Sequence, residues 1–453
     1  PTAGAAAAID EVVYANIFEG LTRIDRNGAV KPALAESWTV SDDGLTYTFK
    51  LRSGVKYHDG TGFDSADVKF SLDRALAEDS TNAQKGLFTP IASVETPDAA
   101  TVVVTLKQPT GSFLFNLGWG DAVIVAPESA AENKSHPVGT GPFVFGRWVK
   151  GDRIEMARNP AYWGTPAKLA SATIKIIPDP AAAVAALLAG DVDAFANFPA
   201  PEAMPQLESD PRLKVVIGTT EGETILAINN ARKPLDDIRV RRALAYAIDR
   251  KAVIEGAMFG YGTPIGSHFA PHHPAYVDLT ARYAYDRNKA TALLTEAGHG
   301  NGLTLSLKLP PTPYARRGGE VIASQLAAIG VKTDIIQVEW AQWLEQVFKG
   351  RDYDLTVISH TEPMDIGIYA RDDYYFNYDD AGFKALMAKL DATVDETARN
   401  ALLAEAQEKL ADDAVNVFLF QLAKHGVWNK DVVGLWENSP VQANDLTEVY
   451  WQE

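Results

Sequence analysis

The segment "TYTFKLRSGVKYHDGTGFDSADVKFSLDRAL" (46–76) has the clearest secondary-structure pattern in the chain. Apolar and polar residues alternate through "TYTFKL" (46–51), which is the period of a half-buried β-strand. Apolar residues then recur every three or four positions through "DSADVKFSLDRAL" (64–76), which begins with two good helix N-cap residues, Asp64 or Ser65 being the expected cap. The segment therefore predicts a strand, a glycine-rich turn and a helix.

The turn contains His58 beside Asp59, between Gly54, Gly60 and Gly62. Such a pair is either half of a catalytic dyad or an Asp-Gly turn without chemistry. The chain has no HExxH, no GxSxG, no Walker A sequence and no complete GxGxxG. We therefore predict a turn, no catalytic residue and no enzyme.

Composition restricts the class of protein further. With 453 residues and 46% apolar content, the chain is long enough for more than one globular domain. A formal net charge of −17 without a basic block argues against nucleic acid as a partner. The absence of cysteine excludes disulfides and thiolate metal sites. The longest apolar runs, such as "AAAVAALLA" (181–189), are about half a membrane span.

The rest of the chain alternates helices and strands. Residues 43–165 are typical of an α+β unit with hairpins. Later, "AAAVAALLAG" (181–190) and "EWAQWLEQVFKG" (339–350) each predict a helix that ends at a glycine and precedes a strand. We expect Gly190 and Gly350 to adopt the left-handed conformation that ends a helix. This order predicts two α/β lobes.

Several blocks resemble the family 5 solute-binding proteins, which are the receptors of ABC importers for peptides, nickel and related solutes. The resemblance covers most of the chain and includes residues 35–74, "VYANIFEGL" (13–21), "VGTGPF" (138–143), "RNPAYWG" (158–164), "LLAGDVDAF" (187–195), "LDDIRVRRALAYAIDR" (235–250) and "QLAAIGVKTDI" (325–335). Family members have a strand before the first block. Here we expect that strand to be absent, and with it a truncated or processed chain without its export signal.

The resemblance implies an α/β, two-lobed periplasmic-binding-protein-like fold of type II, in the large three-domain cluster, with the ligand between the lobes. The expected domains are a core of lobe one (1–42, 168–226 and 425–453), an inserted α+β domain (43–167) and lobe two (227–424). The expected partners are a small-molecule solute and the permease subunits of an ABC transporter. We expect a monomer in the periplasm, or on the extracellular face of an anchoring membrane.

The segment "HTEPMDIGIYARDDYYFNYDD" (360–380) mixes aromatic and ionisable residues directly after a predicted strand. Polar ligand sites commonly use such loops. The ligand-binding residues that we predict in this segment are His360, Glu362, Asp365, Tyr369 and Arg371. Elsewhere, the candidate wall residues are Glu19, Trp119, Tyr314, Arg316 and Trp340, because aromatic rings provide stacking area and arginine binds carboxylates.

The resemblance also points to a departure from the family pattern. Peptide-binding members hold the ligand's amino group with an Asp at the end of this strand, after an aromatic residue. Alignment of the "EP" of the family segment on Glu362 and residue 363 places Ser359 and Thr356 at those two positions. Glu362 or Asp365 would then have to supply the missing carboxylate.

Three functions stay open. The first is a receptor for a polar organic solute, such as a short or modified peptide, an opine or a sugar-like compound. The second is a receptor for nickel or a metal chelate, indicated by His360 and by the histidines of "GSHFAPHHPAY" (266–276). The third is a secreted hydrolase that uses His58 and Asp59 or paired carboxylates. We favour the first, predict no cofactor and no bound metal, and interpret the histidine-rich stretch as a surface loop.

Overall fold

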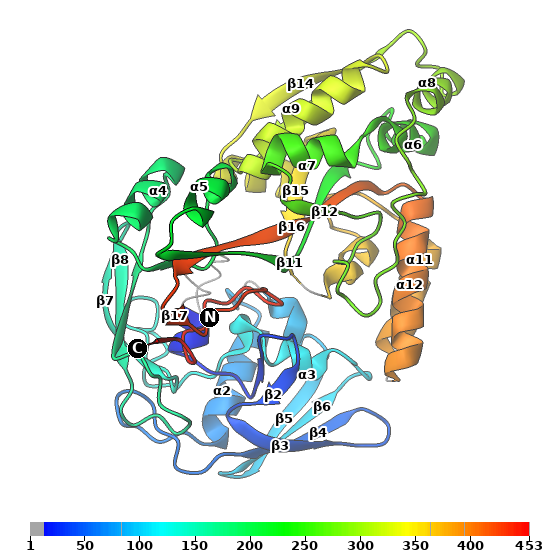
Figure 1. The fold of residues 1–453 in the computed structure, drawn as a ribbon. Coiled ribbons are helices and arrows are strands. Elements are labelled where there is room, and N and C mark those ends of the chain that lie inside the picture. Colours follow the sequence, from blue (N-terminus) through cyan, green and yellow to red (C-terminus); the bar gives the residue numbers. More distant parts are fainter. Residues whose placement is uncertain (1–12, 83, 363, 394, 453) are drawn as a thin grey trace. The chain divides into compact units, whose positions relative to one another are not determined.

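The computed structural model describes residues 13–82, 84–362, 364–393 and 395–452 (Figure 1). The chain divides into two compact units. The first unit comprises Pro1–Gly218, Asp391–Val394 and Lys424–Glu453, and the second comprises Thr219–Leu390 and Asp395–Ala423. The three-domain boundaries expected from the sequence stay a prediction, and the expected absence of a strand before residue 13 concerns residues outside the described ones.

The described residues of the first unit form two larger antiparallel sheets and two short antiparallel pairs. One larger sheet has the order β3 (Ala35–Val40), β4 (Thr46–Leu51), β6 (Thr101–Leu106) and β5 (Ile91–Asp98), and the other has the order β7 (Phe143–Val149), β8 (Arg153–Arg158) and β9 (Ser171–Lys175). The short pairs are β1 (Thr22–Ile24) with β2 (Val30–Pro32) and β17 (Val432–Val433) with β18 (Tyr450–Trp451). The helices and turns are α2 (Ser65–Leu76), η1 (Lys85–Phe88), α3 (Phe113–Asn116), η2 (Gly120–Ala122), α4 (Pro180–Ala189), η3 (Pro201–Ala203) and α5 (Met204–Glu208).

The predicted strand and helix of the opening segment are confirmed as β4 and α2. The Asp64 carboxylate accepts a hydrogen bond from the Ala66 N–H (2.7 Å), and the Asp67 carboxylate accepts one from the Asp64 N–H (2.9 Å). This reciprocal capping fixes the start of the helix. Phe49 and Val68 are fully buried in one core cluster, so the alternating strand and the helical stripe face each other.

The His58 turn joins two of the family blocks. The His58 Nε2–H donates to the Gly141 carbonyl (3.0 Å), and Nδ1 accepts from the Gly139 N–H (3.3 Å). The Asp59 carboxylate instead accepts from the N–H and hydroxyl of Thr61 (3.0 and 2.7 Å). His58 and Asp59 therefore do not form a hydrogen-bonded dyad, and the turn has a structural role.

The second unit is built on a mixed sheet whose two long strands also continue into the first unit. The strands of this sheet are β10 (Ala194–Phe195), which belongs to the first unit, β16 (Asn416–Asn429), β11 (Leu213–Ile228), β15 (Leu355–His360), β13 (Leu303–Leu309) and β14 (Val331–Gln337) in spatial order, with β12 (Gly262–Pro264) beside β16. The two long strands, β11 and β16, are neighbours in this sheet (Figure 1). Strand β15 is antiparallel to β11 and parallel to β13.

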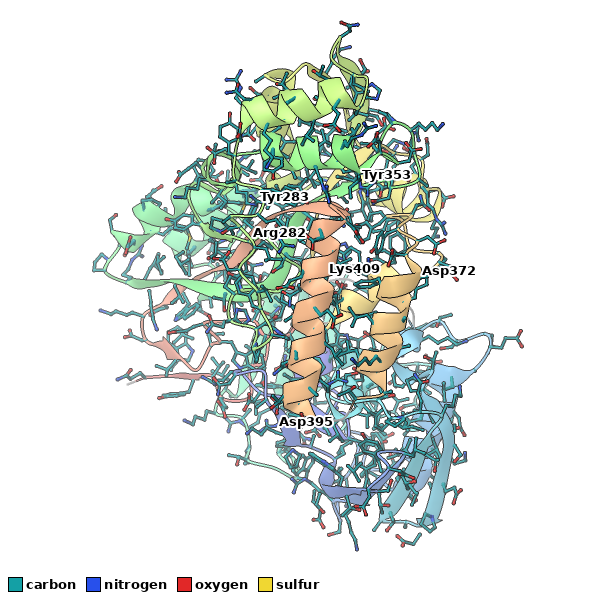
Figure 2. All side chains as sticks on the ribbon, turned by 90° about the vertical axis from the view of Figure 1, so that its right-hand side faces the viewer. Arg282, Tyr283, Tyr353, Asp372, Asp395 and Lys409 are labelled. Atoms are coloured by element: carbon teal, nitrogen blue, oxygen red, sulfur yellow. The ribbon has the colours of Figure 1, made fainter. Side chains whose placement is uncertain are left out.

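Helices cover both faces of this sheet. They are α6 (Ile238–Ala247), α7 (Arg250–Met258), α8 (Arg287–Glu296), α9 (Pro313–Ala327), α10 (Trp340–Trp343), α11 (Ala381–Asp391) and α12 (Glu396–Asp412), with η4 (Leu344–Lys349) and η5 (Asp365–Ala370). Leu226 and Ile228 of β11 face the core formed with α6, α7 and α9, whereas Ile225 and Ala227 face the core formed with α11 and α12. Burial on both faces explains why this strand ends in a continuous apolar run. Helices α11 and α12 lie side by side (Figure 2). Lys409 of α12 pairs with Asp380, which directly precedes α11 (3.0 Å).

Of the two glycines predicted to be left-handed, Gly190 is confirmed and Gly350 is not. Gly190 has a φ of 76°. Gly350 has a φ of −78°, because the preceding residues 344–349 widen into a π-helical turn, and Arg351 takes the left-handed conformation (φ 52°) instead. Within the described residues, no helix is both long and apolar enough to cross a membrane.

Candidate solute-binding site

The polar segment of residues 360–380 begins at the end of strand β15 and therefore lies at one end of the sheet of the second unit. The antiparallel register places His360 opposite Glu223 and Ser359 opposite Thr224. The first helical turn after the strand is η5, which begins at Asp365. Ionisable side chains of β11, β15 and η5 therefore meet at this end of the sheet.

Three of these side chains, together with His268 from the loop after β12, form what we call the histidine–carboxylate cluster: Glu223, His268, His360 and Asp365. His268 Nε2 lies 2.7 Å from Asp365 Oδ1, and its Nδ1 lies 3.0 Å from Glu223 Oε1. The second contact is an ion pair without the geometry of a hydrogen bond. His360 Nδ1 lies 3.6 Å from Asp365 Oδ2, and its Nε2 is 2.9 Å from the Tyr375 hydroxyl. One imidazole thus bridges two carboxylates.

Burial and charge act in opposite directions on the pKa of His268. The side chain is 1% exposed, and burial alone would lower its pKa, but the carboxylates of Glu223 and Asp365 outweigh burial and raise it to about 10. Burial raises the pKa of Glu223 to about 7. Burial would also raise the pKa of Asp365, yet His268 and His360 hold it well below its usual range. His268 is therefore an imidazolium that neutralises buried negative charge.

The histidine-rich loop contacts β11 through two histidines. Glu221 and Glu223 are two residues apart and so point to the same side of the strand. Glu221 pairs with His272, and Glu223 pairs with His268. The surface-loop prediction is wrong for His268, because the docked loop carries this residue into the core, whereas His272 is exposed as predicted.

The donor set of the cluster fits an ion-pair network better than a metal site. Two trios have donor atoms within 4.8 Å of one another: Glu223, His268 and Asp365, and His360, Glu362 and Asp365. However, both ring nitrogens of His268 face carboxylates. Those of His360 contact Asp365 and Tyr375. A metal ion needs a free imidazole lone pair, so it would have to displace these partners.

The remaining predicted residues of the segment differ in exposure. Tyr369 is 2% exposed and packs on Phe376, with ring centroids 4.9 Å apart. Glu362 is partly exposed and accepts a hydrogen bond from the Thr361 N–H (3.1 Å). Arg371 is exposed and pairs with Asp373 (3.3 Å). Among the predicted residues of the segment, Glu362 is therefore a partly exposed carboxylate beside the cluster.

Three more predicted residues lie in the second unit, around the start of α9 and α10. Tyr314 packs against the core, and burial raises its pKa. Arg316 pairs with Glu339 (3.1 Å). Trp340 is 43% exposed and meets the edge of Trp343, with ring centroids 5.9 Å apart. An exposed tryptophan on a packed neighbour is a suitable surface for stacking.

Glu19 and Trp119 belong to the first unit. The Glu19 carboxylate accepts hydrogen bonds from the hydroxyls of Thr140 and Tyr162 and from the indole N–H of Trp163, each 2.8 Å long. Burial raises the pKa of Glu19. Trp119 packs on Phe115, with ring centroids 6.3 Å apart. Both side chains thus have partners within their own unit.

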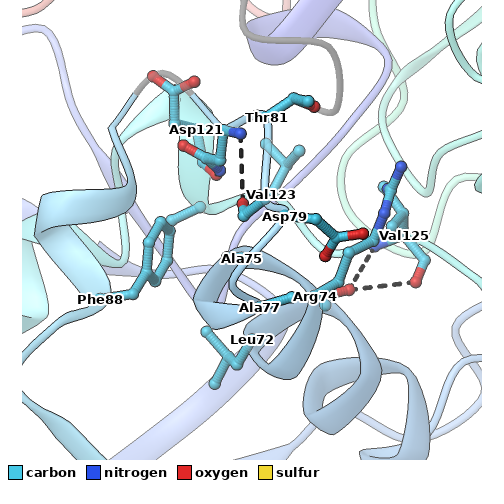
Figure 3. Close-up of a pocket in the computed structure, with 14 residues that line it drawn as sticks. Leu72, Arg74, Ala75, Ala77, Asp79, Thr81, Phe88, Asp121, Val123 and Val125 are labelled. Atoms are coloured by element: carbon cyan, nitrogen blue, oxygen red, sulfur yellow. Dashed lines mark hydrogen bonds between the residues drawn. The ribbon is translucent and has the colours of Figure 1, made fainter.

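The first unit also has a cavity of about 240 Å³ beside α2 (Figure 3). Arg74, Asp79, Asn82, Phe88 and Asp121 are among its lining residues. The Asn82 side chain donates to the Asp121 carbonyl (2.9 Å). None of the predicted ligand-binding residues lines this cavity.

Sequence reasoning missed Glu223 and gave His268 the wrong environment. The available signal was the alternation of acids in "TTEGETILAI" (219–228), where Glu221 and Glu223 precede a buried apolar run. Acids on alternate positions at the end of a buried strand need partners, and the histidines at 268 and 272 have the matching charge.

The fold is that of the periplasmic binding proteins. The DppA protein of Helicobacter pylori, in complex with the peptide STSA, superposes with a TM-score of 0.89 at 26% identity, over 100% of this chain and 97% of that one. The agropinic acid-bound AgaA of A. tumefaciens gives 0.86 at 28% identity, over 99% and 95%. The predicted fold class is confirmed.

The model of the bacterial extracellular solute-binding proteins, family 5, matches residues 29–382, and the chain belongs to this family of ABC importer receptors. The glutathione-binding protein GsiB of Salmonella typhimurium is 36% identical over 347 residues, which are 75% of this chain and 67% of the relative. The GsiB of Escherichia coli O157:H7 is 35% identical over the same shares. These relatives are solute-binding proteins and not enzymes.

Proposed function

We propose that this protein is an extracytoplasmic receptor that captures a polar organic solute by closure of its two lobes and delivers it to the permease of an ABC importer. The solute is a short or modified peptide, an opine or a sugar-like compound. The names of its relatives support this range, because they bind glutathione, a peptide and agropinic acid. The receptor acts in the periplasm as a monomer and does not alter its solute.

The observation that carries the proposal is the carboxylate of Glu362. It lies beside the histidine–carboxylate cluster, with an oxygen within 4.8 Å of donor atoms of His360 and Asp365. Asp365 is already neutralised by His268. The Glu362 carboxylate accepts a hydrogen bond from the Thr361 N–H, and its charge helps to raise the pKa of the nearby His360. This partly exposed carboxylate binds an amino group of the solute, in place of the Asp that the family pattern has at Ser359.

The remaining candidates of the second unit would complete the solute's surroundings. Trp340 offers an exposed ring for stacking, and Tyr314 lies at the start of α9. Arg316 pairs with the solvent-exposed Glu339, and Arg371 pairs with the solvent-exposed Asp373 and lies over the Tyr374 ring. Because exposed ion pairs contribute little, either arginine can exchange its acid for a carboxylate of the solute.

Native mass spectrometry of the purified protein tests the proposal and gives the mass of the solute in the same experiment. Wild-type protein is expected to retain a non-covalent solute that mild unfolding releases unchanged. The Glu362→Gln variant should bind the solute at least about tenfold more weakly than wild type and should therefore retain less of it. The reason is that a hydrogen bond to a charged group contributes about 1.5–3 kcal/mol. Asp372→Asn is the matched control, since this exposed acid of the same segment pairs with Lys384.

Equal solute occupancy in wild type and Glu362→Gln would contradict the role of Glu362. Wild-type protein that carries no solute, and that is not stabilised by glutathione, the peptide STSA or agropinic acid, would contradict the solute class. Recovery of a cleaved solute would instead favour the hydrolase. Stoichiometric Ni²⁺ in equilibrium dialysis, lost on chelation, would favour the nickel receptor, whose donors would be His360, Glu362 and Asp365.

A further inference from the structure

We infer that His268 is a positioning residue for solute binding: it ties the recognition segment (residues 361–362 and 364–371) to strand β11, so that Glu362 is in place before the solute arrives. The inference rests on the proposed function for the role of Glu362. The tie itself is a property of the second unit without solute, and it can be tested separately.

The tie joins three parts of the chain that are far apart in sequence. His268 lies in the loop between β12 and α8 and is 1% exposed. Its two ring nitrogens contact Glu223 of β11 and Asp365, the first residue of η5. The edge of its ring also meets Tyr369 of η5, with centroids 5.4 Å apart. His268 therefore contacts both β11 and the recognition segment from within the core.

Charge makes this contact hard to replace. His268 is faced by Glu223 from β11 and by Asp365 from η5, and His360 of β15 approaches Asp365 from the other side. Tyr369 and Phe269 supply the uncharged walls. Outside the core, Glu221 is already paired with His272. Without the imidazolium, two buried carboxylates would face each other with too little positive charge between them. The packing of the recognition segment against β11 would then be destabilised.

The backbone before Asp365 needs such support. Met364 has a φ of 66°, in the left-handed region that a residue with a long side chain rarely adopts. A conformation of this kind persists only where its surroundings hold it. The support comes from Asp365 on one side and from His273, whose Nε2 lies 3.3 Å from the Met364 sulfur, on the other. Because Glu362 precedes this strained position, its place depends on the same anchor.

Hydrogen–deuterium exchange of solute-free protein tests the tie directly. In His268→Gln, amides of the recognition segment should exchange about tenfold faster or more, while α2 in the first unit stays unchanged. His425→Gln is the matched control: His425 is another buried histidine, on β16 in the first unit, and burial lowers its pKa to about 4, so it carries no charge to lose. Asp365→Asn should accelerate the same segment, and the double variant should be no faster than the faster single variant.

His268→Arg keeps a positive charge but removes the imidazole ring, so it separates the effect of charge from that of shape. The recognition segment should exchange more slowly in His268→Arg than in His268→Gln. If His268→Gln does not fold, Asp365→Asn provides the same readout because it breaks the same contact. Wild-type exchange rates in folded His268→Gln, or additive acceleration in the double variant, would overturn the tie. Faster exchange with unchanged solute occupancy in native mass spectra would overturn the positioning role. Loss of occupancy only in Glu362→Gln would leave the proposed function intact.

Discussion

Glu19 was predicted to contact the ligand, but in the structure its side chain holds parts of the first unit together. Its carboxylate joins three family blocks, because its hydrogen-bond donors are Thr140 of "VGTGPF" and Tyr162 and Trp163 of "RNPAYWG". Its role in ligand binding stays a prediction. A single sequence cannot reveal such a cage, since its donors lie more than a hundred residues away.

Glu19→Gln should lower the free energy of unfolding by roughly 2 kcal/mol, because the amide group turns a donor towards donors and leaves buried hydrogen-bonding groups unsatisfied. Urea unfolding measures the change. Glu36→Gln, at an exposed position of β3, is the control and should stay within about 0.5 kcal/mol of wild type. Equal losses in the two variants would show that the cage contributes nothing.

His268 should make stability depend on pH in the alkaline range. Its pKa is raised from the usual 6.5 to about 10 in the folded protein, so the native state binds the proton more tightly than the unfolded chain. The stabilisation is complete below pH 6.5 and is lost as the pH rises towards 10. The slope from this one group is at most about 1.4 kcal/mol per pH unit.

The measurement is the free energy of unfolding of wild type and His268→Gln at about pH 6, 8 and 10. The difference between the two proteins should shrink as the pH rises, which removes the contributions of other titrating groups from the comparison. A difference that is constant over this range would mean that His268 is not charged in the folded protein.

At the scale of the elements, local sequence patterns predicted regular structure well. The alternation in "TYTFKL" and the spacing in "SADVKFSLDRAL" correspond to β4 and α2, and Asp64 caps the helix. The prediction was wrong at Gly350, because a wide turn placed the left-handed residue one position later, at Arg351. Such a shift depends on hydrogen bonds within the turn, which apolar spacing does not encode.

The glycines of the family blocks give a prediction at this scale. A methyl group on Gly139 would lie 1.9 Å from the Ile17 carbonyl oxygen, a backbone atom that cannot move aside cheaply. Gly139→Ala should therefore destabilise the first unit by about 3 kcal/mol. Gly62→Ala is the control, because a methyl group there meets nothing within 4 Å and the φ of Gly62 is not left-handed. Similar melting temperatures for the two variants would contradict the close approach of these blocks.

At the scale of the whole molecule, the sequence identified the class of receptor but only part of the candidate site. The blocks between residues 13 and 335 are spread along the chain, and the family follows from their order. The segment 360–380 stood out because of its mixed aromatic and ionisable residues. By contrast, Glu223 and His268 meet Asp365 only after β11, β15 and the histidine loop have packed, and no local pattern indicates that meeting.

Small-angle X-ray scattering tests the central claim, that this receptor captures its solute by closing. The protein is freed of solute by unfolding and refolding and is then measured before and after the released solute is returned. Because a ligand that contacts both lobes favours the closed form by its differential affinity, the radius of gyration should fall on return of the solute, and it should not fall in Glu362→Gln. Scattering curves that superimpose, in a sample whose melting temperature shows that solute is bound, would contradict the account.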